Sequence, residues 1–245
     1  MANIALLRLR DAIEKKRFGV VRRVLKVLRP NDPHALKHAQ AASAWRRRFY
    51  KEGGHFSNGH YEAVYTTLFG LDRRFFGDKR ILDIGCGPRG SLEWADNATE
   101  TVGADPLVGV YRRLGTDRHR MKYVEAGAER LPFPDEYFDV TASINSLDHV
   151  DDVNKAMREM LRVTKPGGSI LISVEVDHPP SVTEPTTLSV DEILAGFPNC
   201  SVAYSKVYSL LPGEWSNDVA ALMSKPERPA GSRQLGGMTV YFVKQ

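Results

Sequence analysis

A short apolar strand followed at once by a glycine-rich turn constrains the fold of this 245-residue chain more than any other feature. Residues 80–84 read Arg-Ile-Leu-Asp-Ile, and residues 85–90 read Gly-Cys-Gly-Pro-Arg-Gly. Glycines at such a point let the backbone turn sharply and approach a ligand closely. A second strand, residues 100–104, ends at Asp105, which lies 18 residues after Gly87, near the spacing of a ribose-binding acid. The pattern predicts an α/β sheet with a nucleotide-type site at the carboxyl ends of its strands.

The glycine turn alone fits a nicotinamide or flavin site nearly as well as any other nucleotide site. Asp83, however, stands before the glycines, where dinucleotide sites usually have an apolar residue. A cationic ligand gains electrostatically from a carboxylate there, whereas a pyrophosphate does not. Asp83 therefore favours a positively charged nucleoside over a nicotinamide cofactor.

The rest of the chain continues the alternation of strands and helices. We expect a helix at residues 61–69, a short helix at 91–95 and another at 189–197, with a polar loop at 212–237. The further strands that we expect are at residues 138–143, 169–176, 201–208 and 238–244.

In these segments the sequence resembles the class I S-adenosylmethionine-dependent methyltransferases, especially their small-molecule branch. The matching runs occur in the family's order and at its spacing: residues 81–87, 103–105, 128–133, 138–140, 147–150 and 161–168. The resemblance implies a Rossmann-like, seven-stranded sheet that is mostly parallel, with an antiparallel last strand, helices on both faces and an N-terminal helical extension. It also implies S-adenosyl-L-methionine as the cofactor.

The resemblance implies a role for each matching residue of the cofactor site. The turn and Asp83 would line the methionine part, Asp105 would hold the ribose, and Pro106 or Leu107 would pack on the adenine. The family often has an aspartate where Gly127 stands, so either Glu129 or a backbone group replaces that adenine contact, or the contact is missing. Cys86 is expected as a small buried side chain rather than a nucleophile. The predicted cofactor-binding residues are Asp83, Gly85, Cys86, Gly87, Asp105, Pro106, Ala128, Glu129 and Asn145.

Polar side chains follow the predicted strands at 138–143 and 169–176, and these should face the cofactor. They are Asp148, His149, His178 and Glu184. A histidine can remove a proton from an acceptor hydroxyl, so His149 is the first catalytic candidate and His178 the second. A divalent metal held by Asp148, His178 and Glu184 is an alternative, but no ligand spacing requires it, and no metal is predicted.

The N-terminal region differs in charge from the rest of the chain. Residues 1–51 hold 14 Lys or Arg and 3 Asp or Glu, a balance of +11, so with a total of +4 the remainder carries −7. Helices are expected at residues 5–28 and 34–50, and apolar residues recur along one face of the first: Leu6, Leu9, Ile13, Val20, Val24 and Leu28. That helix either lies on an anionic membrane surface or packs on the catalytic domain with its basic face in solvent. We expect residues 1–75 to form this extension or lid, and residues 76–245 the methyltransferase domain.

The predicted function is methyl transfer, by in-line displacement, to a hydroxyl of a small-molecule, sugar or lipid-linked acceptor. The basic extension also suggests a nucleic-acid methyltransferase. However, Asn-Ser-Leu-Asp stands at 145–148, where a base-flipping Asn-Pro-Pro-Tyr motif would be expected. A non-catalytic cofactor-binding protein is a further alternative. Two cysteines and the lack of a membrane-spanning apolar run predict a cytoplasmic location, with residues 1–30 as the candidate contact with the inner membrane face.

Overall fold

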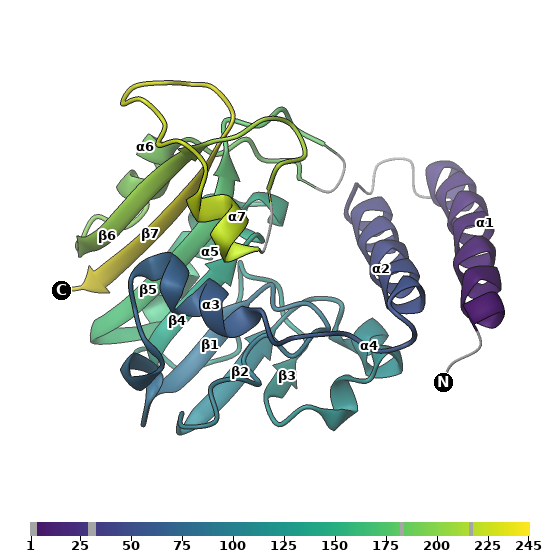
Figure 1. The fold of residues 1–245 in the computed structure, drawn as a ribbon, viewed down its shortest axis with the longest axis horizontal. Coiled ribbons are helices and arrows are strands. Elements are labelled where there is room, and N and C mark those ends of the chain that lie inside the picture. Colours follow the sequence, from purple (N-terminus) through teal and green to yellow (C-terminus); the bar gives the residue numbers. More distant parts are fainter. Residues whose placement is uncertain (1–3, 29–32, 182–183, 216–217) are drawn as a thin grey trace.

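The computed structural model describes residues 4–28, 33–181, 184–215 and 218–245, and a seven-stranded sheet forms its centre (Figure 1). The strand order is β3-β2-β1-β4-β5-β7-β6, in which β7 is antiparallel to both of its neighbours and the strands from β3 to β5 are parallel. The expected sheet is thus confirmed. The strands are β1 Arg80–Ile84, β2 Glu100–Ala104, β3 Lys122–Val124, β4 Phe138–Ile144, β5 Thr164–Val176, β6 Cys200–Ser209 and β7 Gly236–Lys244.

The two faces of the sheet bury separate cores because successive side chains of a strand point to opposite sides. In β1, Leu82 and Ile84 join the core covered by α5 Val153–Val163 and α6 Val190–Ala195, whereas Ile81 joins the core on the other face. That second core is covered by α3 Tyr61–Tyr65 and α7 Val219–Met223. Helices on both faces agree with the expected fold class.

Three local differences separate the structure from the sequence-based expectation. Residues 91–95 form turns rather than a helix: Glu93 N donates to Gly90 O at 3.2 Å and Ala95 N to Leu92 O at 3.1 Å, and these i→i+3 bonds do not propagate. The expected helix at 61–69 divides into α3 and a 3₁₀ turn, Thr67–Phe69. The expected loop 212–237 contains α7, which begins where Asp218 accepts a hydrogen bond from Ala221 N at 3.1 Å.

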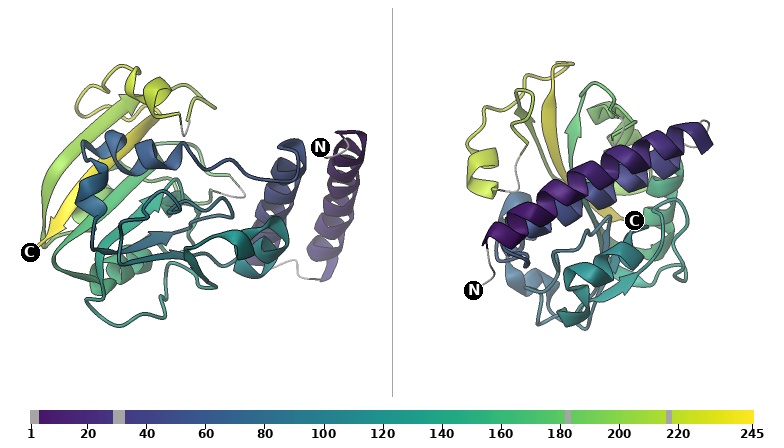
Figure 2. Two further views of the ribbon diagram at one scale, coloured as in Figure 1. Left: turned by 60° about the horizontal axis from the view of Figure 1, so that its bottom comes forward. Right: turned by 90° about the vertical axis from the view of Figure 1, so that its right-hand side faces the viewer.

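Two long helices, α1 Ile4–Leu28 and α2 Pro33–Lys51, form an antiparallel hairpin beside the sheet (Figure 2). The α2 helix lies between α1 and the rest of the molecule, so that α1 is the outermost element (Figures 1 and 2). Residues 61–76 instead pack into the same core as the sheet, where Tyr65 and Phe76 are fully buried. We therefore propose that the extension consists of α1 and α2, which moves the expected boundary at residue 75 toward the N-terminus.

The α1 helix packs through a different face from the one marked by the apolar repeat. Its inward positions include Leu7, which is 9% exposed, and Glu14, which is 5% exposed and ion-paired with Arg46 of α2 at 2.9 Å. The repeat faces away from the protein. Five of its members, Leu6, Leu9, Ile13, Val20 and Val24, are exposed, whereas the side chain of Leu28 lies outside the described residues. Together with the exposed Val27 these five residues form what we call the apolar stripe, at 46–76% exposure. No helix in the described part of the chain is long and apolar enough to cross a bilayer.

Candidate functional site

The glycine turn after β1 adopts a backbone that excludes side chains. Gly85 has φ +76° and Gly87 has φ +59°, in the left-handed region that other residues rarely adopt. A Cβ atom at Gly85 would lie 2.3 Å from Ser146 Cβ, and the Gly85 amide donates to Ala104 O at 2.8 Å. The turn is therefore held between the ends of β2 and β4, with its backbone free of side chains at the carboxyl edge of the sheet.

Asp83 lies beneath this turn, where it is 2% exposed. Its carboxyl group accepts a hydrogen bond from Ser91 Oγ, and the buried Tyr65 side chain lies beside it. Burial raises the pKa of Asp83 to about 7, in spite of the opposing effect of the Ser91 hydrogen bond. A cationic ligand next to this group would favour its ionised form.

Asp105 follows β2 and is also buried, at 7% exposure. One carboxylate oxygen accepts from the Gly87 amide at 3.2 Å and the other from the Leu107 amide at 2.8 Å. Burial raises its pKa, while these two hydrogen bonds oppose the increase. The side chain thus fixes the loop after β2 to the glycine turn, and the side chain of Tyr111 lies beside it.

The remaining predicted cofactor residues surround the same edge. Pro106 is exposed, whereas Ala128 is buried, at 8% exposure. One oxygen of Glu129 accepts from the Asp151 amide at 2.8 Å, so this carboxylate already fixes the loop after β4.

Cys86 is buried, and its side chain points into the core, where a Cβ added at Gly103 would lie 2.6 Å from its Sγ. Burial also raises the pKa of its thiol, which opposes thiolate formation. Only the backbone of Cys86 therefore remains for a ligand.

The α2 helix covers this turn through Trp45. The sequence predicted a helical lid but did not indicate which of its residues would contact the turn. The Trp45 ring lies so near Gly87 that a Cβ there would be 3.0 Å from Cζ2, and it packs edge-on against Phe56 and Tyr111. Arg89 anchors the segment that follows α2: it is ion-paired with Glu52 and donates to Ser57 O at 3.0 Å. No spacing relates Trp45 to the turn, so only the folded chain reveals this contact.

A second cluster of polar side chains lies after β4, beside the glycine turn. Asn145 has φ +50°, and Ser146 Oγ donates to Ile84 O at 2.7 Å, which connects the two loops. The 3₁₀ turn Leu147–His149 follows and carries Asp148, which is 1% exposed. Backbone strain of the Asn145 kind is often found at functional sites.

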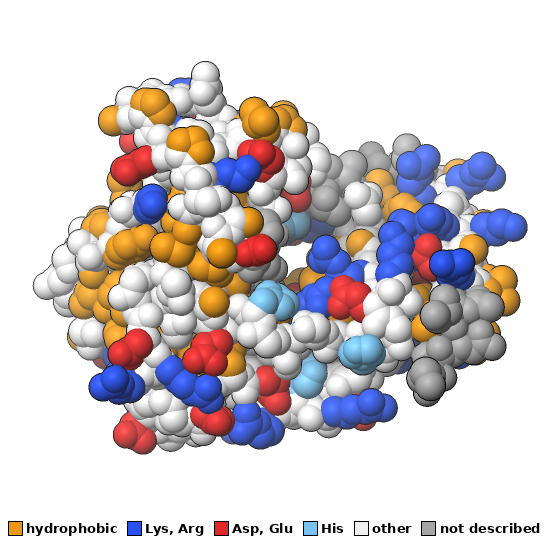
Figure 3. Space-filling view, in the orientation of Figure 1, with side chains coloured by type: hydrophobic (Ala, Val, Ile, Leu, Met, Phe, Trp, Pro, Cys, Tyr) orange, Lys and Arg blue, Asp and Glu red, His pale blue; other side chains and the backbone are white. Residues whose placement is uncertain are grey.

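The structure brings all four predicted acceptor-side residues together. His149 Nε2 lies 3.9 Å from Asp148 Oδ1 and 4.0 Å from Glu184 Oε1, while His178 Nε2 lies 3.6 Å from Asp148 Oδ2. Burial raises the pKa of Asp148. Lys37 of α2 donates to His149 O at 2.8 Å, so the helical hairpin also contacts this loop. Figure 3 shows a hollow between the sheet-bearing body and the hairpin, with histidine side chains near it.

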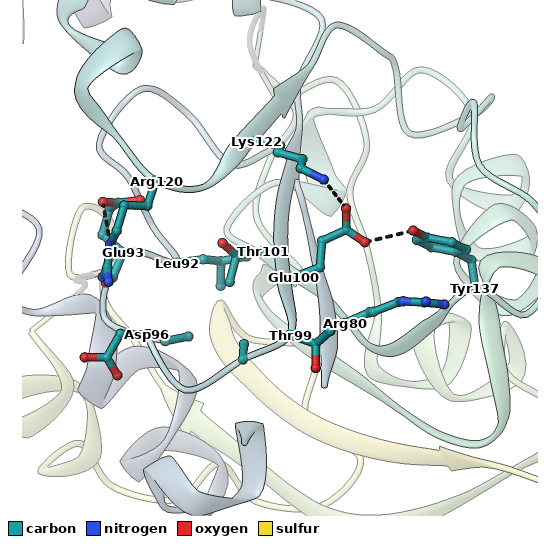
Figure 4. A pocket seen from close by; sticks show the side chains of 12 residues that line it. Arg80, Leu92, Glu93, Asp96, Thr99, Glu100, Thr101, Arg120, Lys122 and Tyr137 are labelled. Carbon is teal, nitrogen blue, oxygen red and sulfur yellow. Dashed lines mark hydrogen bonds and ion pairs between the residues drawn. The ribbon is translucent and has the colours of Figure 1, made fainter. Parts of the chain in front are cut away.

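A separate surface cavity of about 350 Å³ lies at the opposite edge of the sheet, where β1, β2 and β3 begin (Figure 4). Its charged groups neutralise one another: Glu100 accepts from Lys122 at 2.6 Å and from Tyr137 at 2.8 Å. Because ligands of open α/β sheets bind at the carboxyl ends of the strands, we assign no function to this cavity.

Comparison with known proteins matches the sheet-bearing part of the chain to methyltransferases. Residues 82–172 match the family described as "Methyltransferase domain". A ubiquinone/menaquinone biosynthesis C-methyltransferase, UbiE, from Vibrio parahaemolyticus is 38% identical over 128 residues, which cover 46% of this chain and 46% of that protein. A demethylmenaquinone methyltransferase from Renibacterium salmoninarum is 35% identical over 102 residues, covering 41% and 43%. The match thus spans less than half of these relatives' own length.

Solved structures share the fold at low identity. A putative methyltransferase from Haloferax volcanii, in complex with its Trm112 activator, has a TM-score of 0.58 at 15% identity, covering 85% of this chain and 97% of that one. The [4+2]-cyclase SpnF has a TM-score of 0.52 at 21% identity, covering 74% and 77%. The sheet topology and the family match over residues 82–172 together show a methyltransferase domain of Rossmann-like fold in this part of the chain.

Proposed function

We propose that this chain transfers a methyl group from S-adenosyl-L-methionine to a small-molecule acceptor. The observation that carries the proposal is the placement of Asp83 and Asp105, both buried, on the two sides of the positive-φ turn at Gly85 and Gly87. One carboxyl group suits a cation and the other suits ribose hydroxyls, which is the pair of contacts that a sulfonium nucleoside needs. Pro106, Ala128, Glu129 and Asn145 are proposed to complete the cofactor site.

In this mechanism the bound cofactor supplies an electrophilic methyl group on a sulfonium. The backbone of the turn would position it, and Trp45, which lies over Gly87, would limit access of water from the side of α2. The acceptor would enter from the loops after β4 and β5. We propose that His149 and His178 carry the proton-handling part of the reaction, since both flank Asp148 there.

The proposed acceptor is a small hydroxylated molecule, which includes lipid-linked ones. In a phenol-type acceptor, loss of the hydroxyl proton activates either the oxygen itself or a conjugated ring carbon, so the same pocket suits O- and C-methylation of such a molecule. The names of two relatives support a quinone-type acceptor, because they describe a C-methyltransferase of quinone biosynthesis and a demethylmenaquinone methyltransferase. The [4+2]-cyclase with this fold makes a non-methylating role the main alternative.

Calorimetry with S-adenosylhomocysteine tests the cofactor assignment directly. We expect binding by the wild-type chain and at least a tenfold loss in Asp105→Asn, because a ribose hydroxyl would lose a charged acceptor. The matched control is Asp191→Asn, since Asp191 is an exposed acid far along the chain. Absence of heat with the wild-type protein, or tight binding of NADH instead, would refute the proposal. If the wild-type protein binds S-adenosylhomocysteine, a screen with labelled S-adenosylmethionine would distinguish an enzyme from a non-catalytic cofactor-binding protein.

We further propose that α1 places the enzyme on an anionic membrane surface. The apolar stripe lies unburied along α1, where a soluble protein gains nothing from it. Exposed basic residues flank the stripe on both sides, each three or four residues from one of its members. They are Arg10 and Arg17 on one side and Lys16 and Arg23 on the other. Lys and Arg side chains gather on this part of the surface in Figure 3. Apolar burial and charge attraction would thus act together.

Sedimentation with phosphatidylglycerol-containing vesicles tests the membrane proposal. The variant Ile13→Asp/Val20→Asp should bind these vesicles at least about tenfold more weakly, because each apolar side chain contributes on the order of 1 kcal/mol when buried. Leu211→Asp is the matched control, since Leu211 is 66% exposed elsewhere. Equal binding by the stripe variant, equal binding to uncharged phosphatidylcholine vesicles, or a dimer formed through the stripe would contradict the proposal.

A further inference from the structure

The cluster after β4 contains a buried carboxylate that the protein itself does not satisfy. Neither oxygen of Asp148 has a hydrogen-bond partner among the described residues, although the residue is only 1% exposed. An uncompensated buried carboxylate costs several kcal/mol, so such a group is normally neutralised by a proton or a cation. The question is which of these the surroundings favour.

The orientation of His178 argues for a cation. Its Nδ1 lies 3.0 Å from Pro179 O, and because a carbonyl can only accept, Nδ1 carries the proton. In the neutral ring, Nε2 then presents a lone pair toward Asp148 Oδ2 at 3.6 Å. This Nε2 is buried and has no hydrogen-bond partner within the part of the chain that the structure describes. A histidine that donates one N–H to a backbone carbonyl and aims its other nitrogen at a carboxylate is the arrangement seen around metal ligands.

Potential ligand atoms from three side chains, including Asp148, gather at the same place. One atom each from Asp148, His149 and Glu184 lie within 4.8 Å of one another. Ligands held about 2.0–2.2 Å from one ion lie at most about 4.4 Å apart, so a contraction of a few tenths of an ångström closes the set. Glu175 is near enough to interact electrostatically with Asp148 and Glu184, so acids outnumber the two histidines.

We propose that Asp148, His149 and Glu184 bind a divalent transition-metal ion such as Mn²⁺, with His178 as a fourth donor beside Asp148. Mixed imidazole and carboxylate ligands suit first-row transition ions better than Mg²⁺. The inference rests on the proposed acceptor pocket. With the ion bound, His149 and His178 would be ligands, so activation of the acceptor hydroxyl would pass from these histidines to the ion. An acceptor oxygen bound at an open position of such an ion loses its proton more readily.

Mn²⁺ binding to chelator-treated full-length protein, measured by electron paramagnetic resonance, tests the site without any need for turnover. We expect a single tight ion in the wild type and at least a tenfold weaker affinity in Glu184→Gln and Asp148→Asn. Asp191→Asn, the exposed control, should bind Mn²⁺ as the wild type does. If Asp148→Asn does not fold, judged by circular dichroism, Glu184→Gln carries the test, because Glu184 lies in a half-buried loop.

Failure to bind millimolar Mn²⁺ would overturn the metal site, and so would wild-type affinity in Glu184→Gln. An equal loss in Asp191→Asn would also overturn it, because the binding would then not be local. Measuring S-adenosylhomocysteine binding on the same metal-free samples separates this failure from failure of the proposed function. Retained nucleoside binding without Mn²⁺ binding rejects only the metal.

Discussion

Replacing Gly85 by alanine should destabilise the fold for two separable reasons. Alanine in the left-handed region costs about 1–2 kcal/mol. Its Cβ would also lie 2.3 Å from Ser146 Cβ, and relieving such an overlap in a packed site costs about 1–3 kcal/mol. The total of about 2–5 kcal/mol is a large share of the 5–15 kcal/mol typical of a folded domain. Gly115→Ala isolates the first cost, because Gly115 has φ +92° and nothing within 4 Å of an added Cβ.

The free energy of unfolding in urea tests this explanation when it is measured for four proteins: the wild type, Gly85→Ala, Ser146→Gly and the double variant. Ser146→Gly alone should cost about 1–3 kcal/mol, since it removes the hydrogen bonds to Ile84 O and Ser143 Oγ, both 2.7 Å. In the double variant the overlap disappears, so its cost should fall about 1–3 kcal/mol below the sum of the single variants. Strict additivity, or a Gly85→Ala cost no larger than that of Gly115→Ala, would refute the packing account.

Three other predictions concern the site. Burial holds the pKa of Asp83 at about 7, so between pH 4 and pH 7 the folded chain keeps a proton that the unfolded chain releases. The free energy of unfolding should therefore fall as the pH rises through this window, and Asp83→Asn should remove that fall in urea titrations at several pH values. Trp45→Ala should weaken S-adenosylhomocysteine binding about tenfold by calorimetry, because the ring covers Gly87. His149→Ala should lower methyl transfer about 10²-fold in a labelled-cofactor assay while cofactor binding remains, and unchanged turnover would remove His149 from catalysis.

The sheet and the proposed cofactor-binding residues at the carboxyl ends of its strands could be predicted from the sequence, because both depend on local patterns. Apolar runs separated by glycine and polar turns located β1 and β2 to the residue, and positive φ at Gly85 and Gly87 requires the residue type found there. Asp83 lies in β1 shortly before the glycine turn and Asp105 directly follows β2, so locating these two strands also located both acids. Short elements such as β3 and α7 escaped prediction, since three to five residues carry too little periodicity.

The tertiary structure alone decided which faces and which distant residues meet. The apolar repeat of α1 was visible in the sequence, yet α1 packs through Leu7 and Glu14, and the repeat stays exposed. The pattern of apolar residues along a helix does not by itself determine which face packs against the protein. Likewise, the contact of Trp45 with Gly87 joins residues 42 positions apart. This contact follows from the way α2 packs over the glycine turn, which no local pattern encodes.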